Sequence, residues 1–341
     1  MKKLFVSQGN VLVLLFIMLS LAAGCSPDKE TQEKKVSFGL ALEGLPASAS
    51  IFHKLEKETG FPVSYINIFL QWPHDPDLDN FPYESLKSVH SFGAVPILTW
   101  EPMYYENHKE YMIPAKDILQ GRYDDYIRHF ARKTSKLEQP VIIRFAHEMN
   151  LSRYHWGGTI DEYGPDAPGR YIAMFRHVSG IFKDKEIKNA LFAFCPNNES
   201  LPNPLFDPEA DWNRARNYYP GHEYVDVLGM DGYNWGTTRT IEKHGWNSRW
   251  LTFEEIFRDI YQELKTINPD MPVYVFETSS AHKGGNRNAW IKDAFVTAGR
   301  WDIDGVIWFH VDKEEDWRMT GFIETEYYSE TLSMIKNPPG D

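Results

Sequence analysis

The chain has 341 residues, of which 42% are hydrophobic and 15% are aromatic, enough to fill a sizeable globular core. It carries 36 Lys and Arg against 48 Asp and Glu, a formal net charge of -12. Because nucleic acids and anionic membrane surfaces attract basic proteins, this balance argues against both as the main partner and leaves neutral ligands open.

The N-terminus predicts a leader rather than part of the fold. Lys2 and Lys3 precede the apolar run VLVLLFIMLSLAAG, which is shorter than the roughly 20 residues of a membrane-spanning helix and is typical of a signal peptide. The run ends in LAAGC, which resembles a bacterial lipobox. We therefore expect a lipoprotein signal peptide over 1–24, a lipidated Cys25 and a flexible tether up to residue 35. An ordinary signal peptide with an incidental cysteine is the alternative.

A lipidated Cys25 would place the protein outside the cytoplasm, anchored to a bacterial membrane at the cell surface or facing the periplasm. The chain has only two cysteines, so this modification would leave no intramolecular disulfide. We expect Cys195 to be a small buried hydrophobic residue rather than a catalytic thiol.

From Val36 onward, short apolar runs alternate with longer amphipathic stretches, which predicts a single domain over 36–341. The candidate strands are 36–44, 63–72, 93–102, 140–148, 190–197, 225–235, 271–277 and 304–311. The candidate helices include Asp124–Leu137, Arg170–Phe182, Phe253–Ile267 and Asn288–Ala298.

Strands that alternate with helices predict parallel βαβ units, and nearly continuous apolar strands predict a sheet covered on its outer face. Eight such units in about 300 residues favour a (β/α)8 barrel, the TIM barrel, over an open doubly wound sheet. No glycine-rich phosphate loop follows the first strand, which weakens a nucleotide-binding alternative.

Polar and aromatic residues gather where the predicted strands end. Active sites of such barrels are built at the carboxyl ends of the strands. These ends carry Glu43, Gln71, Trp72, Trp100, Glu101, His147, Glu148, Asn197, Asp231, Tyr233, Trp235, Glu277, Trp308 and His310. Carboxylates, amides and indoles on one rim suit a polyhydroxylated ligand.

Several chemistries can be set aside. His147-Glu148 lacks the second histidine of an HExxH zinc motif, and no GxSxG nucleophile motif is present. No lysine stands at a strand end for Schiff-base formation. Carboxylates remain, and a pair of them can cleave a glycosidic bond without a metal or cofactor.

Glu148 on the fourth strand and Glu277 on the seventh would face each other across the barrel. Glu43, Glu101 and Asp231 compete for the same roles, and composition alone does not rank them. Arg144 has the strand parity of Glu148, so we expect it to point into the barrel, as a partner of the nucleophile or as a structural ion pair beneath the site.

Two pairs of motifs resemble glycoside hydrolase family 26. They are VIIRFAHEMN followed by YHWGG, and MPVYVFETSS followed by GGNRNAWIKDAF. The resemblance covers essentially the whole chain after the leader. It implies a retaining (β/α)8 enzyme with its acid/base on strand four and its nucleophile on strand seven.

By this resemblance, Glu148 is the general acid/base, Glu277 is the nucleophile, and His147 is a family feature beside the acid. Tyr233 and Arg144 would help to keep Glu277 ionised. Trp308 would form the floor under the sugar and Trp156 would be the second Trp of the loop after HEMN. The expected substrate-binding residues are Trp72, Trp100, Glu101, Trp156, Asn197, Asp231, Trp235, Trp308 and His310.

The chain departs from mannan-cleaving members in the loop after the acid/base. Those members read HEMNG and then carry a Trp, whereas this chain has Leu151 and Arg153, and its third strand ends in TWEP without a histidine. Arg153 could favour an acidic sugar or be a surface charge. The catalytic pair is unaffected.

We therefore predict a retaining endo-β-glycanase that acts on a polysaccharide, with β-1,4-mannan as the first candidate and mixed-linkage β-glucan or β-1,3-xylan as alternatives. A non-catalytic glycan-binding lipoprotein is the rival from another class. A lyase for acidic polysaccharides would need more cations than the rim offers. A monomer is favoured.

Overall fold

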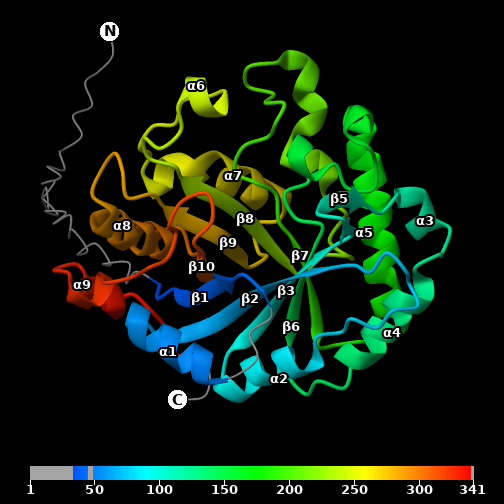
Figure 1. The fold of residues 1–341 in the computed structure, drawn as a ribbon, viewed down its shortest axis with the longest axis horizontal. Coiled ribbons are helices and arrows are strands. Elements are labelled where there is room, and N and C mark those ends of the chain that lie inside the picture. Colours follow the sequence, from blue (N-terminus) through cyan, green and yellow to red (C-terminus); the bar gives the residue numbers. More distant parts are fainter. Residues whose placement is uncertain (1–33, 45–48, 339–341) are drawn as a thin grey trace, which may run out of the picture. The chain divides into compact units, whose positions relative to one another are not determined.

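In the computed structural model of the chain, residues 34–44 and 49–338 are described. Eight parallel strands close into a barrel, each hydrogen-bonded to its neighbours (Figure 1). In order around the barrel they are β1 (Ser37–Leu42), β10 (Gly305–Phe309), β9 (Val273–Ser280), β8 (Val227–Asn234), β7 (Ala190–Phe194), β6 (Val141–Phe145), β3 (Val95–Glu101) and β2 (Val63–Gln71). The predicted (β/α)8 barrel and its eight strands are confirmed.

Helices surround the barrel (Figure 1). They are α1 (Ala49–Thr59), α2 (Tyr83–Phe92), α3 (Ala115–Leu119), α4 (Asp124–Thr134), α5 (Ala167–Asp184), α6 (Ile241–His244), α7 (Phe253–Ile267), α8 (Arg287–Arg300) and α9 (Tyr328–Ser333). The four helices expected from periodicity are present, and α7 matches its predicted bounds. Thr252 starts α7 with a capping box, in which its side chain accepts from the amide of Glu255 and the Glu255 side chain accepts from the amide of Thr252.

Side chains alternate between two cores. One set fills the barrel interior, including Ile97, Ile142, Ala193, Val227, Phe276 and Ile307. The other set lies between the strands and the helices, including Leu98, Ile143, Phe145, Phe194 and Val306. Because the side-chain period of a strand is two, this alternation decides which rim residues face the site and which face the helices.

A hairpin that was not predicted follows β3. It consists of β4 (Met103–Glu106) and β5 (Lys109–Met112), which pair antiparallel. Asn107 and His108 form its two-residue turn with φ values of 50° and 62°. Positive φ at both central residues is the geometry of a type I′ turn, which favours Asn at the first position.

The predicted signal peptide, lipidated Cys25 and most of the tether lie outside the described residues. Within 34–44 and 49–338, no helix combines the length and the apolar character needed to cross a membrane.

Candidate active site

Glu148 is held by an uncommon backbone conformation at the end of β6. Ala146 and Glu148 have φ values of 47° and 51°, in the left-handed region that few residues other than glycine adopt. The amide of Ala146 donates to the carbonyl oxygen of Trp100 at 3.1 Å, and that of Glu148 to the carbonyl oxygen of Cys195 at 2.8 Å. These bonds tie the segment to the ends of β3 and β7 on either side, so the fold maintains this conformation where the chemistry is expected.

The Glu148 carboxyl group is buried, with 8% of the residue exposed. Burial and the nearby negative charge of Glu277 raise its pKa to about 7. Asn197 donates its side-chain amide to Oε1 of Glu148 at 2.6 Å, which favours the anion and opposes this shift. The group can therefore hold or release a proton near neutral pH.

Glu277, on β9, is 6% exposed and is bound through both oxygens. Tyr233, on β8, donates its hydroxyl hydrogen to Oε2 at 2.7 Å. The guanidinium group of Arg144 donates to Oε1. Two donors fix the orientation of this carboxylate, as an anionic nucleophile requires.

Arg144 is fully buried inside the barrel, as its strand parity predicted. Its Nη1 lies 2.9 and 2.8 Å from the two carboxylate oxygens of Asp231, and its Nε donates to Oγ1 of Thr99 at 2.9 Å. Thr99 in turn donates to Oδ1 of Asn67 at 2.8 Å. Arg144 thus joins Glu277 to a polar network that reaches β2, β3 and β8, and both of its expected roles are compatible with this position.

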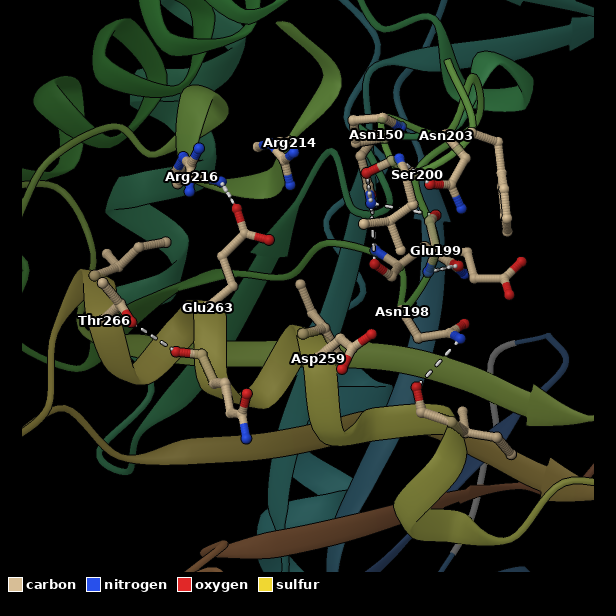
Figure 2. A pocket seen from close by; sticks show the side chains of 18 of the residues that line it. Asn150, Asn198, Glu199, Ser200, Asn203, Arg214, Arg216, Asp259, Glu263 and Thr266 are labelled. Atoms are coloured by element: carbon tan, nitrogen blue, oxygen red, sulfur yellow. Dashed lines mark hydrogen bonds between the residues drawn. The ribbon is translucent and has the colours of Figure 1, made fainter. Parts of the chain in front are cut away.

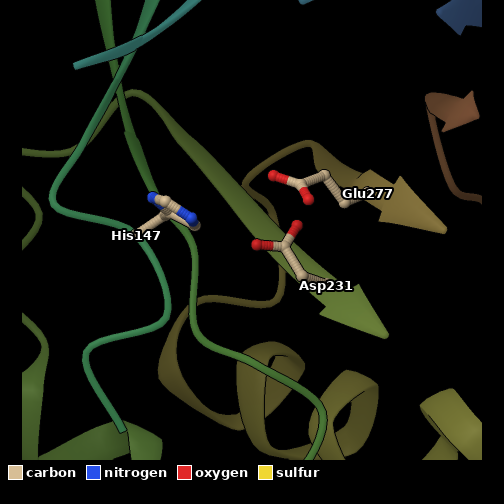
Figure 3. A group of neighbouring side chains, drawn as sticks. All are labelled: His147, Asp231 and Glu277. Carbon is tan, nitrogen blue, oxygen red and sulfur yellow. The ribbon is translucent and has the colours of Figure 1, made fainter. Parts of the chain in front are cut away.

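His147, Asp231 and Glu277 form a buried group whose nearest ligand atoms lie within 4.8 Å of one another (Figure 3). Both carboxylates already accept hydrogen bonds from the guanidinium group of Arg144. Arg144 therefore supplies the positive charge that balances these two buried carboxylates.

The His147 ring is buried beneath the loop that follows it. It lies 4.8 Å from the Tyr154 ring and 6.0 Å from the Trp156 ring, and its carbonyl oxygen accepts from Nε1 of Trp156 at 2.6 Å. Burial and the charge of Arg144 lower the pKa of His147 well below its ordinary value, so the imidazole is neutral.

Glu101 and Trp235 lie at the rim or on the inner side of the barrel, whereas His310 stands between the inward-facing Phe309 and Val311 and has the opposite parity. Glu101 is 3% exposed and accepts from the Gln71 amide at 2.5 Å; burial raises its pKa to about 7. Trp235 is half-buried and packs with the inner cluster. His310 is 8% exposed, its Nδ1 accepts from the Met319 amide at 3.2 Å, and burial lowers its pKa to about 4.

The predicted sugar-binding roles of Trp72, Trp100 and Trp308 are wrong. All three are at most 1% exposed and point toward the helices. Trp100 stacks on Phe130 of α4 at 4.3 Å, and Trp308 packs on Trp290 of α8 at 6.0 Å. Their strand parity is opposite to that of the inward residues. This difference could not be seen from their place at the strand ends alone.

Asp231 and Trp156 are also too buried to contact a sugar as predicted. Asp231 is 0% exposed and both its oxygens accept from Arg144. Trp156 is 3% exposed and one face is covered by Tyr154, stacked at 5.0 Å. Both residues support the site from beneath. Glu43, one of the competing acids, is exposed to solvent beyond β1.

Trp317 occupies an inner position that the sequence did not indicate. Its ring lies 5.2 Å from Tyr233 and 5.0 Å from Trp235, and its carbonyl oxygen accepts from Nε1 of Trp308 at 2.7 Å. It stands in the charged segment KEEDWRM after β10, so no hydrophobic pattern or strand end marks it.

A cavity of about 590 Å³ lies beside the carboxylates, between the loop after β7, the segment Arg214–Arg216 and helix α7 (Figure 2). Glu148 and Glu277 do not line it, although Asn197, which binds Glu148, does. The candidate site is therefore formed by the rim residues and not by this cavity.

Comparison with known proteins supports the resemblance seen in the motifs. The model of glycosyl hydrolase family 26 matches residues 115–249, which include Glu148 and Tyr233. Endoglucanase H of Acetivibrio thermocellus is 29% identical over 90% of this chain, and a mannan endo-1,4-beta-mannosidase of Bifidobacterium adolescentis is 31% identical over 28%.

The chain spans only 32% and 8% of the lengths of these two relatives. Among solved structures, the Bacillus subtilis mannanase BCman superposes with a TM-score of 0.60 at 17% identity, over 88% of this chain and 85% of that one. At this level of identity the superposition concerns the fold, and it confirms the barrel.

Proposed function

Starting from the similarity of this chain to glycosyl hydrolase family 26, we propose that it belongs to that family and is a retaining endo-acting glycosidase that cleaves a β-linked polysaccharide. The observation that carries the proposal is the buried pair of Glu148 and Glu277. One carboxyl group has a pKa raised to about 7, and the other is bound by two donors. A general acid and an anionic nucleophile need these two environments.

The reaction would proceed by double displacement. Glu277 attacks the anomeric carbon while Glu148 gives its proton to the leaving glycosidic oxygen, so the glycosidic bond breaks as the bond to Glu277 forms. Glu148, now ionised, removes a proton from water, which attacks the same carbon and releases Glu277. The sugar leaves with its original anomeric configuration.

The first candidate substrate is β-1,4-mannan, the substrate in the name of the B. adolescentis relative. β-Glucan is the second candidate, because the relative matched over 90% of this chain is named an endoglucanase. A panel of mannan, mixed-linkage glucan, xylans and bacterial exopolysaccharides separates them. An endo-enzyme releases oligosaccharides of mixed length early, which chromatography resolves.

Replacing Glu277 by Ala tests the enzyme proposal against a non-catalytic glycan-binding protein. We expect hydrolysis to be lost while affinity for the glycan largely survives. For the wild-type protein, NMR of the first products should show the β-anomer. Absence of reducing ends from every β-glycan would overturn the proposal, and release of the α-anomer would overturn the retaining mechanism.

We further propose that Cys25 carries a lipid that anchors the protein to a bacterial membrane. The support is the LAAGC ending of the apolar run. The full chain should fractionate with membranes, and a Cys25→Ser variant should be released into the soluble fraction. Equal fractionation of the two would contradict the anchor.

A further inference from the structure

Arg153, the residue that stands where mannan-cleaving members carry a Trp, is engaged in a bidentate ion pair. Its Nη1 and Nη2 lie 2.5 and 2.7 Å from the two carboxylate oxygens of Glu110. Tyr105 donates to the same carboxylate at 3.0 Å. The charge of Arg153 is thereby matched, which leaves it unsuited to recognise an acidic sugar.

The pair joins two separate parts of the rim. Glu110 belongs to β5 in the hairpin after β3, and Arg153 belongs to the segment after β6 that contains Glu148. The amide of Ala115, just past the hairpin, also donates to the carbonyl oxygen of Gly157 at 2.8 Å. The hairpin is therefore fastened to the segment that carries the acid/base.

Tyr154 is the residue that this arrangement holds in place. Its ring is stacked parallel to Trp156 at 5.0 Å, and the guanidinium group of Arg153 lies 4.7 Å from its centre. The His147 ring lies 4.8 Å away. Three neighbours thus fix the ring.

The hydroxyl group of Tyr154 has no hydrogen-bond partner within the described part of the chain, and the side chain is half-buried. Burial, followed by the charges of Glu148 and Glu101, raises its pKa well above the ordinary value. The hydroxyl therefore remains protonated and lies within the field of the carboxylates, as a donor without an acceptor.

We propose that Tyr154 is a substrate-binding residue that donates a hydrogen bond to a neutral sugar beside Glu148, and that Arg153 and Glu110 are positioning residues that hold it there. This inference rests on the proposed glycosidase function for its ligand, a neutral β-linked pyranose chain. The ion pair itself can be tested without turnover.

We call the ion pair between Arg153 and Glu110 the clamp. It is tested by hydrogen exchange of the amides in residues 103–112. Arg153→Ala and Glu110→Ala should each accelerate exchange in this hairpin, and the double variant Arg153→Glu with Glu110→Arg should restore slow exchange. Arg258→Ala is the control, because Arg258 is also 53% exposed and pairs with Glu254 on α7, away from the hairpin. Unchanged exchange in the single variants would overturn the clamp, whether or not the protein cleaves a glycan.

The contact with substrate is tested with Tyr154→Phe, which removes only the hydroxyl group. We expect KM to rise about tenfold, the effect of one lost hydrogen bond, with kcat changed less. Tyr83→Phe on α2 is the control. An unchanged KM in Tyr154→Phe, in a protein whose wild type is active, would overturn the role of Tyr154 and leave the proposed function standing.

Arg153→Ala should raise KM by a similar factor, and the charge-exchanged double variant should recover it. Titration of an oligosaccharide into the Glu277→Ala background gives the same comparison as a Kd. If the Tyr154→Phe change weakens binding there while no glycan is cleaved by the wild type, the proposed function fails and the binding role survives.

Discussion

Asn197 donates its side-chain amide to Oε1 of Glu148 over 2.6 Å. Asn197 stands in the segment after β7 and Glu148 in the segment after β6, so the bond joins the ends of two adjacent barrel strands. An amide donor stabilises the carboxylate, whereas burial and Glu277 destabilise it. The balance leaves the pKa of Glu148 at about 7, a value that allows it to act as an acid in one step and as a base in the next.

Asn197→Ala should move the high-pH limb of the activity profile upward. The first step needs Glu148 protonated, so activity falls as pH rises through its pKa of about 7. Without the amide, the anion is less stable and the pKa rises further. The measurement is kcat/KM against pH. A limb that stays in place or moves downward would contradict the assignment of Glu148 as the acid.

Glu148→Ala should affect substrates according to their leaving groups. A polysaccharide needs protonation of its leaving oxygen, so we expect its hydrolysis to fall by about 10²–10⁴-fold. The phenolate of an aryl glycoside with an acidic phenol leaves without a proton. With such a substrate, the rate of formation of the covalent intermediate should change far less. Burst kinetics measure this step. Glu277→Ala is the comparison, because it should abolish both reactions.

Arg144→Met should destabilise the fold strongly. It would leave Asp231, which is 0% exposed, without its partner, and breaking a buried ion pair costs about 3–5 kcal/mol. Denaturant unfolding near neutral pH measures the loss. Arg128→Ala is the control, because Arg128 is 39% exposed and pairs with Asp124 at the surface, where a pair is worth about 0–1 kcal/mol. Equal losses in the two variants would contradict a central role for the network.

The strands could be predicted, and Glu148 and Glu277 could be proposed as a catalytic pair, because their signals are local. Each barrel strand is an apolar run bounded by polar residues, and Glu148 and Glu277 each follow or end such a run. The orientation of Trp100 and Trp308 depended on register, and one residue along a strand reverses the face. Their neighbours point inward, as the alternation requires: Phe309 lies in the inner cluster, and Glu101 lies within the field of Arg144 and Glu277.

The clamp and Trp317 could not be predicted because they depend on contacts between loops. Arg153 and Glu110 are 43 residues apart, and nothing in either segment indicates the other. The β4–β5 hairpin has short, half-exposed strands with little alternation of hydrophobic and polar residues. Loop geometry of this kind is decided by packing on the finished barrel.

The outward position of Trp308 and the inner position of Trp317 predict different effects when each is replaced. Trp308→Ala should reduce stability by about 3–5 kcal/mol, since it empties a site between β10 and α8, while KM of the remaining folded enzyme stays near that of wild type. Trp317→Ala should reduce activity, since the ring supports Tyr233, which binds Glu277. Thermal unfolding and kinetics on both variants separate the two. A large rise in KM in Trp308→Ala would restore its predicted role under the sugar.

The raised pKa of Glu101 predicts that the stability of the fold depends on pH. Glu101→Gln should weaken this dependence. Its pKa is raised from 4.5 to about 7 mainly by burial, so the folded state binds its proton more tightly than the unfolded chain. The resulting stabilisation is fully present below pH 4.5 and is lost as pH rises through 7. A shift of this size corresponds to an upper limit on the order of 3 kcal/mol.

Glutamine cannot ionise and keeps an oxygen to accept from Gln71. Glu101→Gln should therefore be more stable than wild type at pH 8 and similar to it near pH 4.5, measured by urea unfolding at both pH values. Glu148 has a raised pKa as well, so the variant should keep part of the pH dependence. Glu242→Gln on exposed helix α6 controls for the change in net charge. An equal difference from wild type at both pH values would show that Glu101 does not carry this proton.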